Sequence, residues 1–99
     1  MALPSAITVV GRKYQIVIKE DLQELCGQCD YDNLRIDIKS GQHPFLEADT
    51  LLHEVVHSID DAMQLKMNER QVHCVATGLI AALKDNPEFL EYLYKAIKE

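Results

Sequence analysis

The chain has 99 residues, of which 47% are hydrophobic and 26% charged, and its formal net charge is −6. A chain of this size supports one small core, so we expect a single globular domain over residues 1–99. The negative charge repels phosphate backbones and anionic lipid headgroups, which argues against nucleic acid or a membrane as a partner. No apolar run is long enough to cross a bilayer, and residues 1–5 lack the features of a signal peptide. We therefore expect a cytoplasmic protein.

The cysteines do not predict a disulfide framework. Cys26, Cys29 and Cys74 are an odd number in a chain without an export signal, which indicates reduced thiols. Cys26 and Cys29 have the C-x-x-C spacing that can hold zinc or exchange disulfides. However, a closed zinc site needs two more ligands, and no second C-x-x-C exists in the sequence. We interpret this pair as two incidental thiols near a turn.

The first forty residues have the composition of β-strands. Two runs are rich in β-branched residues, and a third alternates between apolar and charged side chains: 7–10, 14–18 and 34–39. Residues 11–13 suit a turn or bulge between the first two runs, and residues 30–33 are a cluster of turn formers. Residues 21–26 predict a short helix that Gly27 ends. We expect a small antiparallel sheet.

The rest of the chain is predicted to form three helices. Apolar residues recur at intervals of three and four over 46–63, which predicts a long amphipathic helix. Asn68 can cap a second helix after the short connection 64–67, with Gln71 reaching back in a capping box. Pro87 is well placed to open a third, short amphipathic helix over 88–98. Together these elements predict an α+β fold in which the sheet packs on the helices.

One pentapeptide carries most of the functional information. His53-Glu54-Val55-Val56-His57 is an H-E-x-x-H sequence inside the first predicted helix. Four residues are just over one helical turn, so both imidazoles project from one face, as two ligands of one metal ion require. Glu54 lies beside the first ligand and could act as general base on a water molecule held by the metal. The motif predicts one Zn²⁺ per chain.

A catalytic zinc ion needs a third protein ligand and an open position. Asp60 and Asp61 follow His57 too closely on the same helix to reach the metal. Glu69 and His73 lie four residues apart on the second helix, and both would face the first helix if the two packed antiparallel. Spacing alone does not choose between Glu69 and His73, although a carboxylate would partly neutralise the dication.

These residues resemble a known family. Leu-Leu-His-Glu-Val-Val-His at 51–57, followed by Asn68-Glu69, is similar to minimal gluzincin-type zinc metallopeptidases, and to small phage and prophage H-E-x-x-H proteins related to the ImmA/IrrE group. The turn before strand 34–38 and the Leu-Lys-Asp-Asn-Pro sequence at 83–87 extend the resemblance. It implies His53, His57 and Glu69 as zinc ligands and Glu54 as general base. Thermolysin-like enzymes have an aspartate where this chain has His73.

We therefore expect a zinc metallopeptidase that hydrolyses peptide bonds of a protein or peptide substrate. The edge of strand 34–39 could pair with an extended substrate chain. Spacing does not select an oxyanion donor from the available side chains, which are His43, His73, Tyr14, Tyr31 and Tyr92. Two alternatives are a non-catalytic zinc-containing regulatory or binding module of phage origin, and a toxin–antitoxin or phage-regulatory factor that acts on one dedicated partner. A protein side chain closing the coordination sphere would favour the binding module, and an accessible groove would favour the enzyme.

Overall fold

The N-terminal strands form a mixed four-stranded sheet. The computed structural model describes residues 2–99, and its strands have the order β1-β2-β4-β3. The strands are β1 (Ala6–Val9), β2 (Arg12–Lys19), β3 (Gly27–Asp30) and β4 (Arg35–Lys39). β1–β2 and β3–β4 are antiparallel hairpins, whereas β2 and β4 pair in parallel. The α+β class is confirmed, but the expectation of an entirely antiparallel sheet is wrong, because β3 runs back antiparallel to β2 and β4 then inserts between them, parallel to β2.

Two local predictions in this region need correction. Val10 and Gly11, with φ of 48° and 79°, make the turn between β1 and β2, so Arg12 and Lys13 already belong to the second strand. Residues 21–26 form turns instead of a helix. The side chain of Asp21 accepts the backbone N–H of Gln23, whose φ is 59°, and this local bond competes with helix formation.

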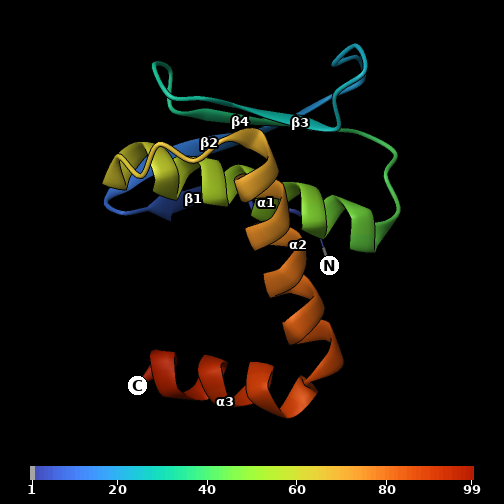
Figure 1. The fold of residues 1–99 in the computed structure, drawn as a ribbon. Helices are drawn as coiled ribbons and strands as arrows, with labels where there is room; N and C mark the ends of the chain where they lie inside the picture. Colours follow the sequence, from blue (N-terminus) through green and yellow to red (C-terminus); the bar gives the residue numbers. More distant parts are fainter. Residues whose placement is uncertain (1) are drawn as a thin grey trace.

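The strand that sequence analysis missed, β3, forms one edge of the sheet. It pairs with β4 on one side, and β4 pairs with β2 on its other side. Residues 34–39 therefore have no free edge, and the expectation that this strand could bind substrate is wrong. The two edge strands of the sheet are β1 and β3, and both contact α1 (Figure 1).

The three helices begin close to where their caps predict. They are α1 (Pro44–Met63), α2 (Glu69–Asp85) and α3 (Pro87–Lys98). The His43 side chain accepts the N–H of Phe45, and Pro44 occupies the first turn, so α1 begins two residues earlier than expected. Asn68 and Gln71 form the predicted capping box of α2, with distances of 2.8 and 2.9 Å. Among the described residues, no helix combines the length and hydropathy needed to span a bilayer.

α1 packs on two neighbours, and this leaves one face for the site. One apolar face, with Leu51, Val55 and Ile59, covers the sheet core formed by the buried side chains of Val9, Tyr14, Ile36 and Ile38. A second face packs Val56 against Val72 and Ala76 of α2. α2 crosses α1 and extends away from the sheet instead of lying antiparallel along α1, which corrects the expected packing (Figure 1).

Candidate metal centre

The H-E-x-x-H segment lies in the middle of α1. His53 and His57 occupy the part of the helix left between the two packing faces, and their ring centroids are 4.9 Å apart. Each imidazole side chain is 20% exposed, so both are held by neighbours but remain reachable. The one-turn spacing of the two histidines places them side by side, as the sequence predicted.

Glu69, the first residue of α2, joins the two histidines. One oxygen, Oε1, lies 2.6 Å from Nε2 of His53, and the other, Oε2, lies 3.1 Å from Nε2 of His57. Burial opposes ionisation of Glu69, but the hydrogen bond to His53 and the charge of both imidazoles outweigh it, so the pKa of Glu69 lies below its usual value. The carboxylate is therefore ionised at neutral pH.

The loop between the helices fixes where Glu69 lies. α1 ends at Met63 and is capped by Gln64, whose left-handed conformation turns the chain, and Leu65 N–H bonds to the carbonyl of Asp60. The side chain of Asp60 accepts the N–H of Met67 at 3.1 Å. Asp60 thus tethers the loop to α1, and the capping box then starts α2 with Glu69 facing the two histidines.

The three side chains form a donor set that fits a metal ion. The Nε2 or Nδ1 and carboxylate oxygen atoms of His53, His57 and Glu69 all lie within 4.8 Å of one another. Two imidazoles and one carboxylate are a ligand set used by catalytic zinc sites, in which the fourth position is left to water or substrate. Among residues 2–99, His53, His57 and Glu69 are the one group of three or more His, Cys, Asp or Glu side chains close enough together to hold an ion.

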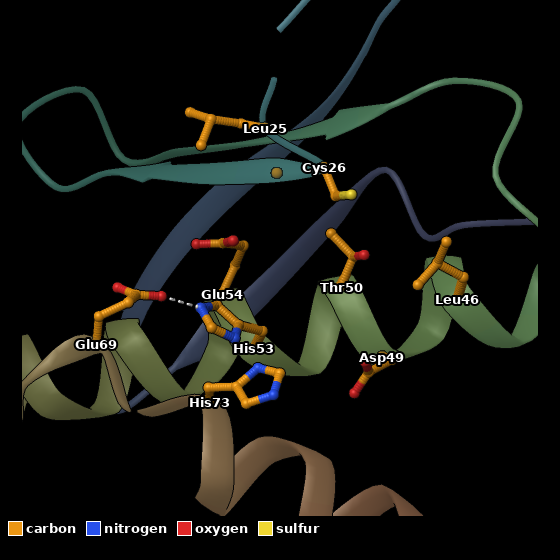
Figure 2. A pocket seen from close by; sticks show the side chains of 10 residues that line it. Leu25, Cys26, Leu46, Asp49, Thr50, His53, Glu54, Glu69 and His73 are labelled. Atoms are coloured by element: carbon orange, nitrogen blue, oxygen red, sulfur yellow. Dashed lines mark hydrogen bonds and ion pairs between the residues drawn. The ribbon is translucent and has the colours of Figure 1, made fainter. Parts of the chain in front are cut away.

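Glu54 lies beneath the edge strand, next to these ligands. The residue is 5% exposed, and its side chain points toward β3 (Figure 2). Burial, and to a smaller extent the negative charge of Glu69, raises the pKa of Glu54 to about 7. Gly27 allows this approach: a Cβ there would lie 2.7 Å from Cγ2 of Thr50 and 3.2 Å from Oε2 of Glu54. A side chain at position 27 would therefore force Thr50 or the strand to shift.

Two adjoining cavities, of about 290 and 370 Å³, flank the ligands between β3 and the helices. Both are lined by Leu25, Gly27, His53, Glu54 and Glu69. The first continues toward Cys26, Leu46, Asp49, Thr50 and His73 (Figure 2). The second continues toward Gln28, Cys29, Tyr31 and His57. The candidate site is thus an open trough that runs along the edge strand.

The structure separates the remaining candidate residues. His73 lines the first cavity, with its ring centroid 6.1 Å from that of His53, and Tyr31 lines the second. Burial raises the pKa of Tyr31 to about 12, so its hydroxyl keeps its proton. Tyr14 is fully buried in the sheet core and Tyr92 lies on α3, so neither lines the trough. His43 caps α1.

The acidic residues after the motif have other partners. Asp60 tethers the loop, and Asp61 forms an ion pair with Arg12 of β2 at 2.6 Å. Neither belongs to the ligand group, as expected from their positions on the helix.

The thiols of Cys26 and Cys29 are free and line different cavities. Sγ of Cys29 lies 3.4 Å from Oγ of the buried Ser58, and burial raises the pKa of the Cys29 thiol. Cys26 lies in the bend before β3, and Cys29 lies within β3 close to the turn at residues 31–34, which agrees with the expectation of two thiols near a turn. Gly27, Asp49 and Thr50 also line the cavities, and the sequence alone did not indicate them. Gly27 could have indicated this position in the sequence, because a glycine permits the close approach of a strand and a helix as well as the end of a helix.

Comparison of the chain with known protein families, curated proteins and solved structures finds no match.

Proposed function

We propose that this chain is a zinc-dependent peptidase of the minimal gluzincin type, related to the ImmA/IrrE group and acting on peptide bonds inside the cell. The observation that carries the proposal is the convergence of His53, His57 and Glu69 beside Glu54 in an open trough. His53, His57 and Glu69 would hold the zinc ion. When bound, zinc would polarise the scissile carbonyl and acidify a water molecule.

The residues of the chain account for the rest of the reaction. Glu54 takes a proton from the attacking water, whose oxygen bonds to the carbonyl carbon. The C–N bond then breaks, and the proton passes from Glu54 to the leaving amine. Tyr31 and His73, one in each cavity, are the side chains available to donate a hydrogen bond to the carbonyl oxygen as it gains charge.

An extended peptide fits the edge of β3. The strand has a pairing partner on one side, β4, and its other edge borders the trough. Main-chain hydrogen bonds to such an edge hold an extended substrate without demanding one sequence. The two cavities on either side of Glu54 would then take substrate side chains from both sides of the scissile bond.

The alternative is a binding module in which zinc is structural. A structural zinc site is closed by a fourth protein ligand. Within residues 2–99, three residues make up the ligand group, and His73 is not one of them. The open cavities and the missing fourth ligand favour an enzyme.

Metal analysis and one conservative substitution test the proposal. The purified protein should contain about one zinc ion per chain, and His53→Ala or His57→Ala should remove it. Glu54→Gln keeps the shape of the side chain but cannot accept a proton, so it should retain zinc and lose a factor of about 10²–10⁴ in hydrolysis of a peptide library. Full zinc content in both histidine variants would refute the site. Equal hydrolysis by Glu54→Gln would refute the mechanism, and zinc binding without hydrolysis by the parent protein would favour the binding module.

A further inference from the structure

One carboxylate oxygen of Asp49 is buried without a partner. Oδ1 of Asp49 has no hydrogen-bond partner among residues 2–99. Such an oxygen gives up its hydrogen bonds to water and gains none from the protein, which opposes folding. Asp49 also lines the first cavity beside the candidate metal centre. The donor that this oxygen lacks therefore has to come from the wall of the cavity or from a ligand in it.

His73 is the side chain in the wall of this cavity that is placed to supply the donor. Figure 2 shows its imidazole beside that of His53, with the carboxylate of Asp49 on the side of His73 away from Glu69. His73 is exposed, so its ring has room to turn toward Asp49. A neutral imidazole carries one N–H donor and one acceptor nitrogen. If the N–H of His73 pairs with Oδ1 of Asp49, the acceptor nitrogen is left to face His53.

His53 needs an acceptor at the nitrogen that does not bind the metal. Nε2 of His53 lies 2.6 Å from Oε1 of Glu69, so Nε2 is the ligand atom and the ring proton stays on Nδ1. Metal-binding histidines usually donate this N–H to a fixed acceptor, which holds the ring in position. The ring centroids of His53 and His73 are 6.1 Å apart. A hydrogen bond between two imidazole nitrogens needs a centroid separation of about 5 Å, so an approach of about 1 Å completes it.

We propose that His73 and Asp49 are positioning residues for His53 in the metal-bound protein. Nδ1–H of His53 donates to one nitrogen of His73, and the N–H on the other nitrogen of His73 donates to Oδ1 of Asp49. Each member of this chain meets the group it lacks: His53 gains an acceptor, and the buried oxygen of Asp49 gains a donor. The two hydrogen bonds fix the His53 ring and make it a stronger ligand. The inference rests on the proposed metal centre.

This assignment also separates the roles of the two cavities. Both nitrogens of His73 are then used, so Tyr31 in the second cavity is left to donate a hydrogen bond to the carbonyl oxygen of the substrate. A basic side chain of the substrate is the other donor that Asp49 could accept. The buried position of Oδ1 favours His73, which belongs to the wall of the cavity, over a group that enters from solvent.

Zinc affinity and the stability of the metal-free chain test the proposal together. Asp49→Ala should weaken zinc binding by about tenfold in competitive titration, as His73→Ala does. The metal-free Asp49→Ala variant should nevertheless melt at the temperature of the metal-free parent or above it, because it loses an unpaired buried oxygen. A residue that only supported the fold would lower the melting temperature as well. Glu47→Ala is the matched control, since Glu47 carries the same charge on the same helix, lies outside both cavities and should leave zinc affinity unchanged.

A carboxylate at position 73 tests the order of the chain of hydrogen bonds. His73→Asp offers His53 an acceptor that needs no help from Asp49, so adding Asp49→Ala to this variant should leave its zinc affinity unchanged. The zinc-bound parent should also show, by NMR, an imidazole N–H of His73 that exchanges slowly with water, because that proton is held in a hydrogen bond. Asp49→Ala should abolish this signal.

The outcomes separate this inference from the proposed function. Parental zinc affinity in Asp49→Ala, or an equal loss from Asp49→Ala in the parent and in His73→Asp, would overturn the inference and leave the metal centre standing. A loss confined to hydrolysis of substrates with basic side chains, with zinc affinity unchanged, would assign Asp49 to the substrate instead. A parent chain that binds no zinc would overturn both the inference and the proposed function.

Discussion

Glu69 and His53 meet at the junction of two helices: Oε1 of Glu69 lies 2.6 Å from Nε2 of His53, although 16 positions separate the two residues. His73, the other candidate ligand, has its ring centroid 6.1 Å from that of His53 and lines the adjoining cavity. The geometry therefore favours Glu69 over His73 as the third ligand, a choice that spacing left open.

We expect Glu69→Ala to weaken zinc binding by more than about a hundredfold, and His73→Ala to weaken it by no more than about tenfold. Competitive titration against a chromophoric chelator measures both affinities. The His73 variant should also lose turnover while it retains the metal. A large loss of zinc from His73→Ala with little loss from Glu69→Ala would mean a three-histidine site and would contradict the gluzincin assignment.

The tether from Asp60 to the loop should matter for metal binding although Asp60 is no ligand. Its side chain accepts the Met67 N–H, and removing this bond in Asp60→Ala should lower the free energy of unfolding by about 1 kcal/mol. Zinc affinity should fall as well, because Glu69 is then less firmly positioned. Asp61→Ala is the matched control, since Asp61 pairs with Arg12 at the surface and should leave zinc affinity unchanged. Equal zinc affinities for the two variants would refute the role of the tether.

The close approach of β3 to α1 predicts a strained substitution and its relief. Gly27→Ala places a Cβ 2.7 Å from Cγ2 of Thr50, which should lower the free energy of unfolding by about 1–3 kcal/mol. Thr50→Ser removes that methyl group and retains the hydroxyl that donates to Gln42. Chemical denaturation of the two single variants and the double variant gives the coupling energy. The double variant should be more stable than Gly27→Ala alone, and an additive result would mean that Thr50 is not the obstacle.

Asp37 should make stability depend on acid pH. Asp37 lies in β4 and is fully buried, and this burial by itself would raise its pKa. Hydrogen bonds from Gln28 and Arg35 and the positive charges of Arg35 and Lys19 have the opposite and stronger effect. The pKa of Asp37 therefore lies below its usual value. A depressed pKa contributes stability above the unfolded-state value of about 3.9, and that contribution is lost as pH falls through the folded pKa.

The free energy of unfolding should therefore decline as the pH falls below about 5, toward and past the folded pKa. Asp37→Asn should be less stable than the parent at pH 7 by about 1–3 kcal/mol, and the difference should shrink in acid. Denaturation of metal-free parent and variant over this pH range measures it. A constant difference would show that Asp37 does not lose its charge there.

The sequence by itself determined what depends on near neighbours. The periodicity of residues 46–63, the capping box at Asn68 and the position of Pro87 were enough to predict the three helices within one or two residues at their starts. The four-residue spacing of His53 and His57 likewise determined that the imidazoles lie side by side. Helix turns, caps and i,i+4 contacts form between residues close in the chain, so a local pattern records them.

The tertiary structure decided what depends on distant partners. Nothing local distinguishes residues 27–30 as a strand, because the segment is stabilised by pairing with β4 and by the approach of α1 at Gly27. The parallel pairing of β2 with β4 and the free edge at β3 follow from the order of strands in the sheet, which alternation of side chains does not encode. Glu69 reaches His53 because the loop after Gln64 turns α2 across α1, and the direction of that turn is a property of the packed helices.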